Sequence, residues 1–289
     1  MTCISIVIPT YNRPAGLAAC LESLALQTYP LKNIEVIVVD DGGSVNLEPV
    51  IRPFLDKPGV RFLRQNNTGP AGARNAGVSH ASGEFISFVD DDCVLPEDWL
   101  ATLIPHLKAD PSKMYGGYTA NMLGDNIYSV TSQLLIDYLY EYYNTDPGQA
   151  RFLASNNMSM SRDLFVAAGG FDADFPGASG EDRELCDRWL DLGHFICYVP
   201  DVRVLHGHQL NFRSFCRQHY NYGTGAIRFW QRKSERQQVK FRIEPTTFYT
   251  GLMSYAWTKK LSRPVPVSFL MMISQVANAM GFIYTKISK

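Results

Sequence analysis

The sequence lacks paired cysteines. Its six cysteines stand far apart, and no Cys-x-x-Cys pair occurs among them. Neither a zinc site nor a disulfide framework is therefore indicated, and a reducing, cytoplasmic environment is expected. The N-terminus has no basic segment followed by a long apolar run, so a signal peptide is not expected. Internal repeats and low-complexity tracts are also absent, which leaves an ordinary globular chain.

Acidic residues are scarce in the last third of the chain. Residues 203–289 contain 14 Lys or Arg and only two acids, Glu235 and Glu244, a balance of +12. Residues 1–202 hold the other 13 basic residues against 26 acidic ones, a balance of -13. This division indicates an anionic partner for the C-terminal part. A membrane surface, a nucleic acid and a phosphorylated acceptor all fit it.

The composition, 46% hydrophobic and 19% charged over 289 residues, fits one large α/β domain with an appendage or two small domains. In the first 112 residues, short β-rich runs alternate with helical patterns. This alternation predicts a doubly wound, mainly parallel sheet with helices on both faces. Strands are expected at residues 4–8, 34–39, 60–63 and 85–89, and helices at residues 15–26, 48–55, from about 73, and 96–107.

The second half is less regular. Helices are expected at residues 127–143, 163–168 and 181–192, and a short strand at residues 202–205. The helix at 127–143 is rich in tyrosine, a pattern that favours packing over a sugar-binding platform.

Polar residues follow three of the expected strands, at Pro9-Thr10-Tyr11-Asn12, Asp40-Asp41 and Asp90-Asp91-Asp92. Ligands of doubly wound sheets bind at the carboxyl ends of the strands, so these residues should meet in one crevice. Three adjacent carboxylates repel one another unless a cation is near, and a divalent metal prefers carboxylate oxygens. The alternative is a solvated acidic turn that caps the following helix.

Six motifs occur in order along the chain. Together they resemble the family-2 glycosyltransferases, which have the GT-A fold and are typically inverting. The resemblance covers residues 1 to about 225. It implies a nucleotide-binding half at about 1–112 and an acceptor half at about 113–225, followed by a basic, amphipathic helical extension at 226–289. The motifs are Val7-Ile8-Pro9-Thr10-Tyr11-Asn12-Arg13, Val38-Val39-Asp40-Asp41-Gly42, Gly72-Ala73-Arg74-Asn75-Ala76-Gly77, Phe88-Val89-Asp90-Asp91-Asp92, Gly169-Gly170-Phe171-Asp172 and Gly180-Glu181-Asp182.

The resemblance implies roles for the donor-binding residues. Asp41 would accept the N–H of a uracil-like base, which favours a UDP- or dTDP-linked sugar. Pro9 and Tyr11 would form the wall beside that base, within the strand-end motif that also holds Thr10 and Asn12. Asp40-Asp41 could instead form an Asx turn.

Two further donor-side roles follow. Arg74 would meet phosphate or ribose, with a surface arginine as the alternative. Asp91 would lie towards the ribose.

The same resemblance places a metal at the aspartate triplet. Asp92 is the expected ligand for Mg²⁺ or Mn²⁺, with Asp90 at the other end of the Asp-x-Asp pattern. His206 follows a strand and could complete the metal shell, while a hydrogen-bonded structural histidine is the alternative. His208 is a weaker candidate of the same kind.

An inverting transfer needs one base on the face opposite the leaving group. The resemblance implies that the base lies in the Glu-Asp pair, with Asp182 first and Glu181 second. A carboxylate at a helix N-terminus is stabilised in its charged form, which suits a base. The same position would also suit a residue that only caps the helix.

Residues 264–285 carry no charge and are flanked by basic residues. The length permits a membrane span, but Ser268, Ser274, Gln275, Asn278 and Gly281 make it a poor one. Apolar residues recur on one helical face, which favours an interfacial helix on an anionic leaflet. Packing on the domain or a dimer contact is the alternative. The basic flanks are Lys259, Lys260, Arg263, Lys286 and Lys289.

The expected function is thus that of an inverting, metal-dependent, hexosyltransferase-like enzyme. The chain lacks the Gln-x-x-Arg-Trp signature and the several membrane spans of the family's processive synthases, so single additions are expected. The expected partners are a nucleoside-diphosphate sugar, a saccharide or lipid-linked acceptor of the cell envelope, and an anionic membrane surface through residues 259–289. No nucleic acid partner is expected, and an oligomer is left open. Membrane binding would make the cytoplasmic protein peripheral on the inner face of the cell membrane. A nucleotidyltransferase and an inactive nucleotide-sugar-binding scaffold are the alternatives.

Overall fold

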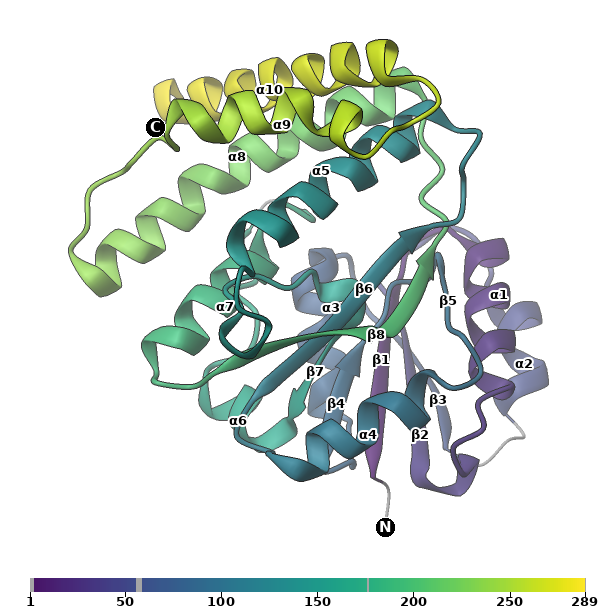
Figure 1. The fold of residues 1–289 in the computed structure, drawn as a ribbon. Helices are drawn as coiled ribbons and strands as arrows, with labels where there is room; N and C mark the ends of the chain where they lie inside the picture. Colours follow the sequence, from purple (N-terminus) through teal and green to yellow (C-terminus); the bar gives the residue numbers. More distant parts are fainter. Residues whose placement is uncertain (1–2, 56–58, 176, 289) are drawn as a thin grey trace.

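The computed structural model describes residues 3–55, 59–175 and 177–288. Within these residues the centre is a sheet of eight strands in the order β3-β2-β1-β4-β7-β6-β8-β5 (Figure 1). The strands are β1 (Ile4–Thr10), β2 (Ile34–Asp40), β3 (Val60–Arg64), β4 (Phe85–Phe88), β5 (Cys93–Val94), β6 (Met114–Asn121), β7 (Met158–Ser161) and β8 (Ile196–His206).

The N-terminal half of the sheet is parallel. β1 pairs in parallel with β2 and β4, and β2 pairs in parallel with β3. Helices α1 (Pro14–Ala25), α2 (Glu48–Leu55) and α3 (Gly69–Ser79) connect these strands. β1 and β2 are buried along their whole length, which matches their mostly apolar, β-branched sequence, and the buried polar side chains Ser5 and Glu35 hydrogen-bond to each other. The α/β class predicted from the alternation is confirmed.

Helices cover both faces of the sheet, as predicted. On one face α1, α2 and α4 (Trp99–Ala109) bury Leu17, Ile51 and Leu103 against the strands. On the other face α3, α6 (Arg162–Ala167) and α7 (Glu181–Asp191) do so, with Phe165 and Trp189 in that core. The helix expected from residue 96 begins later, at Trp99.

The second half of the sheet is mixed, and three of its strands, β5, β6 and β7, were not predicted. β7 pairs in antiparallel orientation with β4 and β6, while β6 and β8 are parallel. The short strand expected at residues 202–205 is the end of the eleven-residue β8. This arrangement carries His206 to the same edge as the aspartate triplet, because Cys93 of β5 pairs with His206.

A layer of helices lies over one end of the sheet (Figure 1). It consists of α5 (Ile127–Tyr143), α8 (Phe212–Gln237), α9 (Thr246–Thr258) and α10 (Pro264–Ile287). α8 and α10 touch through glycines: a Cβ added at Gly223 would lie 1.9 Å from the Asn278 carbonyl oxygen, and one at Gly281 would lie 2.0 Å from that of Tyr220. Residue 225, the expected domain boundary, lies inside the continuous helix α8.

α10 has two different faces. One face packs on α8 and α9, with Val267 and Met271 almost fully buried. The other face leaves large apolar side chains in solvent, including Phe269 at 59% exposure and Met280 at 60%. Among the described residues α10 is the one helix long and apolar enough to cross a membrane by length and composition. The basic flank at Lys289 lies outside the described residues.

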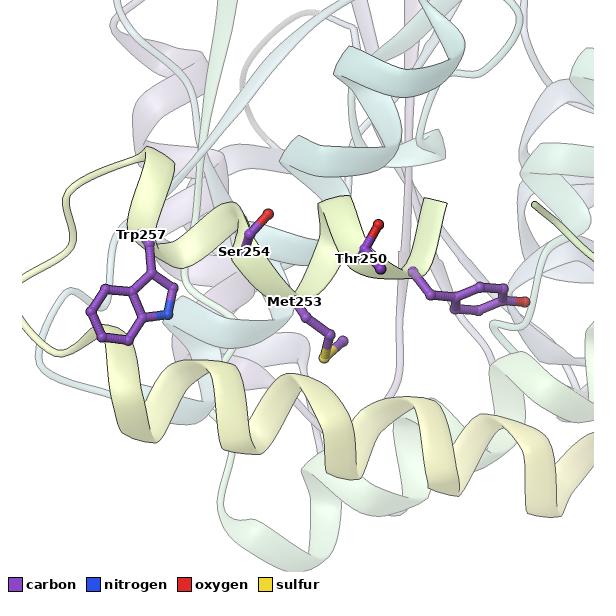
Figure 2. Close-up of a pocket in the computed structure, with 5 residues that line it drawn as sticks. Thr250, Met253, Ser254 and Trp257 are labelled. Carbon is purple, nitrogen blue, oxygen red and sulfur yellow. The ribbon is translucent and has the colours of Figure 1, made fainter. Parts of the chain in front are cut away.

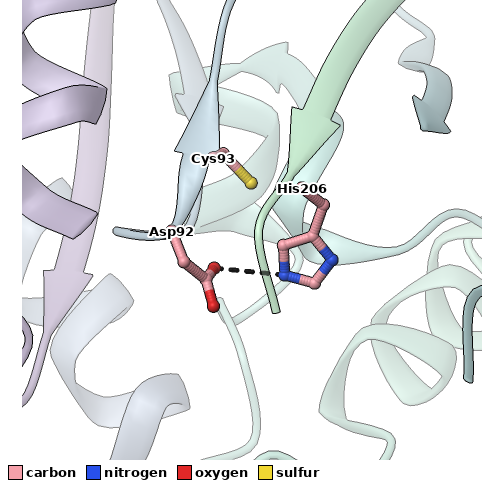
Figure 3. A group of neighbouring side chains, drawn as sticks. All are labelled: Asp92, Cys93 and His206. Carbon is pink, nitrogen blue, oxygen red and sulfur yellow. Dashed lines mark ion pairs between the residues drawn. The ribbon is translucent and has the colours of Figure 1, made fainter. Parts of the chain in front are cut away.

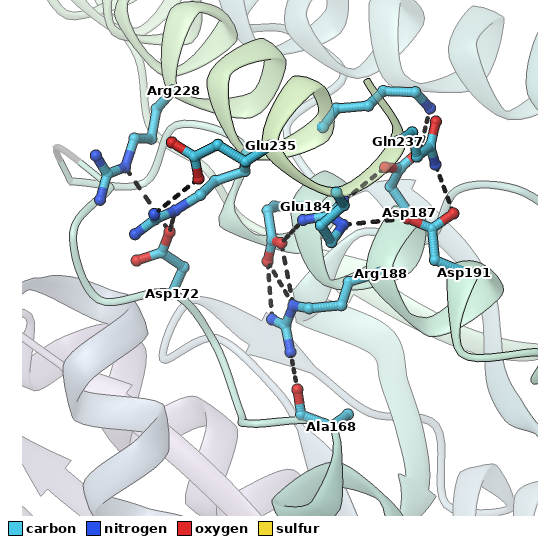
Figure 4. A network of polar contacts seen from close by, with 12 residues as sticks. Ala168, Asp172, Glu184, Asp187, Arg188, Asp191, Arg228, Glu235 and Gln237 are labelled. Atoms are coloured by element: carbon cyan, nitrogen blue, oxygen red, sulfur yellow. Dashed lines mark hydrogen bonds and ion pairs between the residues drawn. The ribbon is translucent and has the colours of Figure 1, made fainter. Parts of the chain in front are cut away.

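Ion pairs join α8 to α7 and to the segment before it (Figure 4). Arg236 Nη1 lies 2.5 Å from Glu184 Oε1, and its Nη2 lies 2.7 Å from Asp187 Oδ2. Arg232 Nε lies 2.6 Å from Asp172 Oδ2. Acidic partners within the molecule therefore neutralise part of the basic charge after residue 202. The paired residues are Arg228, Arg232, Lys233 and Arg236 of α8, and Lys259, which pairs with Glu141.

Candidate active site

The first strand-end motif and the aspartate triplet meet directly. Thr10 Oγ1 donates a hydrogen bond to Asp91 Oδ2 at 2.7 Å. Arg13 Nη1, just before α1, lies 3.2 Å from Asp91 Oδ1 and 2.7 Å from Asp92 Oδ2. Sequence reasoning gave Arg13 no role, although it is the last residue of the first motif. Its guanidinium balances two carboxylates of the triplet.

The triplet carboxylates differ in their surroundings. Asp91 is buried, and burial is the main cause that raises its pKa to about 6. Burial also acts on Asp92, but the contacts with His206 and then Arg13 outweigh it and hold the pKa of Asp92 well below its usual range. Asp92 is therefore the stronger anion of the two. The side chain of Asp90 is 29% exposed and lines the cavity described below.

Asp92, Cys93 and His206 form a compact cluster (Figure 3). His206 Nε2 lies 3.1 Å from Asp92 Oδ1, and the ligand atoms of the three residues lie within 4.8 Å of one another. Apart from His206, the buried Asp92 Oδ1 has no hydrogen-bond partner among the residues that the structure describes. Burial lowers the pKa of His206, but its hydrogen bond to Asp92 outweighs that effect and raises it. Burial raises the pKa of Cys93 well above its usual value, so its thiol stays protonated.

Asp41 holds the loop that leads into α3. Its Oδ1 accepts from Thr68 N at 2.9 Å and from Gln65 Nε2 at 2.8 Å. Its Oδ2 accepts from Gly69 N at 2.8 Å. The neighbouring Asp40 accepts from Gly43 N at 2.9 Å, which is the turn considered as an alternative for this pair. Turn formation thus belongs to Asp40, and Asp41 orders the loop at residues 65–69.

The other residues of the first motif have separate positions. Pro9 is buried within β1, and Tyr11 is 52% exposed at the strand end. Asn12 has a positive φ of 57°, and its Oδ1 accepts from Val45 N at 2.9 Å. Asn12 therefore ties the turn after β1 to the turn after β2.

Arg74 is buried, not a surface side chain. Only 3% of its surface is exposed. Its Nη2 lies 2.7 Å from Asp90 Oδ1, and its Nη1 lies 3.0 Å from Glu181 Oε1. Arg74 thus connects the aspartate triplet to the start of α7.

Glu181 and Asp182 have unequal freedom. Glu181 is 3% exposed, pairs with Arg74, and accepts from the backbone N–H groups of Ser179 and Gly180 at 2.9 and 3.1 Å. Asp182 is partly exposed and accepts from the N–H of Arg183. Burial and then the charge of Glu181 raise the pKa of Asp182 to about 7.

A cavity of about 740 Å³ brings the catalytic candidates together. Asp41 and Tyr11 are not among its lining residues, so the base-binding candidates lie beyond it along the ends of β1 and β2. Side chains from α5, α8 and α10, mostly apolar but including Ser132, Gln218 and Asn278, line its other part. The polar lining residues at the sheet include Arg74, Asp90, Glu181, Asp182, His206 and His208.

A second hollow, of about 470 Å³, lies on α9. Its lining residues are Tyr249, Thr250, Met253, Ser254 and Trp257, with no carboxylate or histidine. In Figure 2, Met253 and Trp257 project from one side of α9 and Thr250 and Ser254 from the other. The large cavity, and not this hollow, contains the candidate base residues Glu181 and Asp182.

Known proteins resemble this chain in sequence and in fold. The family model described as glycosyl transferase family 2 matches residues 5–167, more than half of the chain. Glycosyltransferase AglE of Haloferax volcanii is 25% identical over 235 residues, which cover 78% of this chain and 74% of that protein. The chain spans half or less of the length of several other curated glycosyltransferases that it matches.

Two solved structures show the same fold. The mannosyltransferase PcManGT from Pyrobaculum calidifontis, in complex with GDP-Man and Mn²⁺, aligns with a TM-score of 0.64 at 19% identity, over 99% of this chain and 79% of that one. S. aureus TarS 1-349 in complex with UDP aligns with a TM-score of 0.58 at 16% identity, over 99% of this chain and 91% of that one. The GT-A type fold expected from the motifs is thereby confirmed. The chain belongs to glycosyl transferase family 2 and is a glycosyltransferase.

Proposed function

We propose that the chain transfers one sugar at a time from a nucleoside-diphosphate sugar to an acceptor hydroxyl, with inversion and with the help of a divalent cation. The observation that carries the proposal is the shared cavity. Asp90, Asp182 and His206 come from three separate segments and line the same space, and buried Arg74 pairs with Asp90 and Glu181. Support for a leaving diphosphate and a base for the hydroxyl are both needed within reach of one sugar.

The residues at the triplet fit a divalent cation. Asp92 Oδ1 is buried and, within the described part of the chain, has no hydrogen-bond partner apart from His206. Carboxylate oxygens are the ligands that Mg²⁺ and Mn²⁺ prefer. Asp92, Asp90 and His206 would hold the ion, whereas the protonated thiol of Cys93 is a poor ligand. A bound ion of this kind neutralises charge on a departing diphosphate. The Mn²⁺ in the mannosyltransferase structure supports this choice of cofactor.

Asp182 is the proposed base, and Glu181 is a positioning residue. Both oxygens of Glu181 already contact Arg74 or backbone N–H groups, so its carboxylate is committed to structure. Asp182 faces the cavity and can accept the proton of an acceptor hydroxyl. With Asp182 on one side of the sugar and the diphosphate on the other, the attack takes place opposite the leaving group, which produces inversion.

Asp41 is the proposed contact to the donor base. Among the described residues its Oδ2 accepts from a single donor, Gly69 N, and a carboxylate oxygen can accept a second hydrogen bond. The N–H of uracil or thymine would fill that position, with Pro9 and Tyr11 beside the base. The complex of TarS with UDP supports uridine, while the mannosyltransferase with GDP-Man makes guanosine the necessary comparison.

We infer a cytoplasmic enzyme that is peripheral on the inner face of the membrane and acts on a saccharide or lipid-linked acceptor of the cell envelope. The exposed apolar face of α10 supports this location, together with the basic residues Lys260, Arg263 and Lys286 beside it.

The proposal is tested with the full chain by calorimetric titration with UDP, dTDP and GDP, with and without MnCl₂. UDP or dTDP should bind in the presence of Mn²⁺, and Asp92→Ala should reduce that binding at least tenfold. Asp98→Ala, an exposed aspartate before α4, is the matched control and should bind like the wild type. Equal nucleotide binding with and without metal would exclude the cation site.

Donor sugars are then screened for hydrolysis and transfer. Asp182→Asn should reduce transfer by about 10²–10⁴-fold, the contribution typical of a general base, while donor binding stays unchanged. Full transfer by Asp182→Asn would reject Asp182 as the base. A nucleotidyltransferase or an inactive scaffold would show no donor hydrolysis at all.

A further inference from the structure

The cavity that contains Asp182 has a long apolar part, which the proposed donor site and base do not use. Leu139 of α5, Phe229 of α8 and Phe282 of α10 line it. The carboxylates and histidines of the lining, apart from Glu244, lie at the sheet, whereas the helices contribute apolar side chains together with uncharged polar ones such as Ser132, Gln218 and Asn278. The cavity therefore has a charged end and a mainly apolar end. An acceptor made only of saccharide would place hydroxyl groups against these apolar side chains. Those hydroxyl groups would have no hydrogen-bond partners there, which costs free energy.

Aromatic rings form the outer end of the apolar part. The ring of Trp230 lies 5.4 Å from that of Phe241, and the ring of Phe241 lies 5.0 Å from that of Phe282. Phe241 is 47% exposed and Ile283 is 54% exposed, so the cavity opens to solvent beside them.

The opening is continuous with the exposed face of α10. Ile283 lines the cavity, and Met280 and Val276, one and two turns earlier on the same helix, are 60% and 56% exposed. Arg242 and Lys286 line the cavity at this end, and no ion pair involves them within the described chain. A basic rim beside an apolar face is complementary to a lipid layer with anionic head groups.

We propose that the apolar part of this cavity binds the hydrocarbon chain of an amphiphilic acceptor that resides in the membrane on which α10 lies. The chain enters between Phe241 and Ile283, and the acceptor hydroxyl reaches Asp182 at the charged end. This inference rests on the proposed function, because it assigns the acceptor to the cavity of the proposed base. It names the acceptor class as a lipid with a hydroxyl-bearing polar head.

Quenching of Trp230 fluorescence by brominated chains measures the binding directly. The full chain carries Trp257→Phe to remove an exposed tryptophan of α9, and Trp99 and Trp189 are almost fully buried in the core. The first probes are 6-bromohexanoic, 8-bromooctanoic and 12-bromododecanoic acid, below their micelle concentrations. The affinity should rise with chain length, by up to about fourfold for each added methylene that is buried.

Two pairs of variants locate the site. Ala226→Phe fills the cavity and should abolish the dependence on chain length, whereas Ser234→Phe, at an exposed position of α8 outside the lining, should retain it. At the opening, Ile283→Glu should reduce binding of 12-bromododecanoic acid at least tenfold. Its matched control is Tyr284→Glu, because Tyr284 is 63% exposed and does not line the cavity.

The membrane source is tested with anionic vesicles whose phospholipid chains are brominated. Quenching by both the free acids and the vesicles, lost in Ala226→Phe and in Ile283→Glu, supports the proposal. Quenching by the free acids but not by the vesicles would overturn the proposal that the acceptor enters from the membrane. An affinity that does not depend on chain length would overturn the hydrocarbon-binding site itself. No transfer is needed for this readout, and UDP binding is measured on the same variants. Failure of the donor or base assignment is thus distinguishable from failure of this inference.

Discussion

Two adjacent carboxylates at the start of α7, Glu181 and Asp182, have different surroundings. Glu181 is fully engaged with Arg74 and the backbone before the helix, while Asp182 faces the cavity. The sequence alone ranked the two but could not separate them, because both suit a helix N-terminus. The distinction comes from Arg74, which is 107 residues earlier in the chain and, besides Asp90, pairs with Glu181.

The raised pKa of Asp182 predicts an acidic limit to activity. A base must be charged, and burial with the charge of Glu181 raises the pKa of Asp182 to about 7. Transfer should therefore be constant above pH 8 and fall about tenfold per pH unit well below pH 7, as the carboxylate gains its proton. The rate at saturating donor and acceptor is measured from pH 5 to 9, with UDP binding across the same range as control. A rate that stays constant down to pH 5.5 would contradict the assignment.

At the scale of elements, the parallel half of the fold could be predicted and the mixed half could not. β1, β2 and β4 have continuous apolar sequences bounded by turn residues, so their pattern is local. β6 contains Gly116 and Gly117, and β7 is the short run Met158–Ser161, so neither has a strong strand pattern. They are strands because β4 and β8 supply their hydrogen-bond partners, which a single sequence does not reveal.

The same limit applies to the candidate site. The triplet, Asp41 and Asp182 could be found because they lie in recognisable motifs. The contacts of Arg13 with Asp91 and Asp92 could not be predicted, because the local sequence around a loop arginine does not reveal its distant partners. The apolar end of the cavity was missed as well, because it forms only where α5, α8 and α10 come together.

The contact of α8 with α10 predicts a strict requirement for small residues. A side chain at Gly281 would collide with the Tyr220 carbonyl oxygen, which is backbone and cannot rotate away. Gly281→Val should therefore lower the free energy of unfolding by about 1–3 kcal/mol. Urea denaturation measures the effect.

Gly124→Val is the control, because a Cβ there meets nothing within 4 Å. It should stay within about 0.5 kcal/mol of the wild type. Equal stability of the two variants would show that α10 does not pack on α8 in solution.

In the whole molecule, the basic residues after residue 202 include a group that is paired with acidic residues and a group beside α10. Arg228, Arg232, Lys233 and Arg236 pair with acidic residues of α7 and the segment before it, so they are not available to an external anion. The basic residues beside α10 remain. The net charge after residue 202 is therefore larger than the basic charge that is available to an anionic partner. The position of Lys260, Arg263 and Lys286 beside α10 still favours a lipid surface as that partner.

Binding to that surface predicts a lipid-dependent sedimentation. The full chain should pellet with phosphatidylglycerol vesicles and stay in the supernatant with phosphatidylcholine vesicles. Val276→Glu combined with Met280→Glu should reduce pelleting at least tenfold, since both side chains are more than half exposed on α10 and would meet the lipid. Val166→Glu, which changes a 62% exposed valine on α6, should pellet like the wild type. Equal pelleting with both lipids would exclude an anionic membrane partner.

The ion pairs that join α8 to α7 and to the segment before it make the packing of these elements sensitive to ionic strength. The pair of Arg232 with Asp174, which joins α8 to the segment before α7, is partly exposed and is screened by salt, whereas Glu184 of α7, which pairs with Arg236, is 2% exposed and is screened much less. Salt that detaches the protein from vesicles should therefore loosen the contact between α8 and this segment first and leave the contact between α8 and α7 in place. Since α7 carries the proposed base and α8 lines the acceptor cavity, wash conditions for membrane extraction and assay conditions need to be set together.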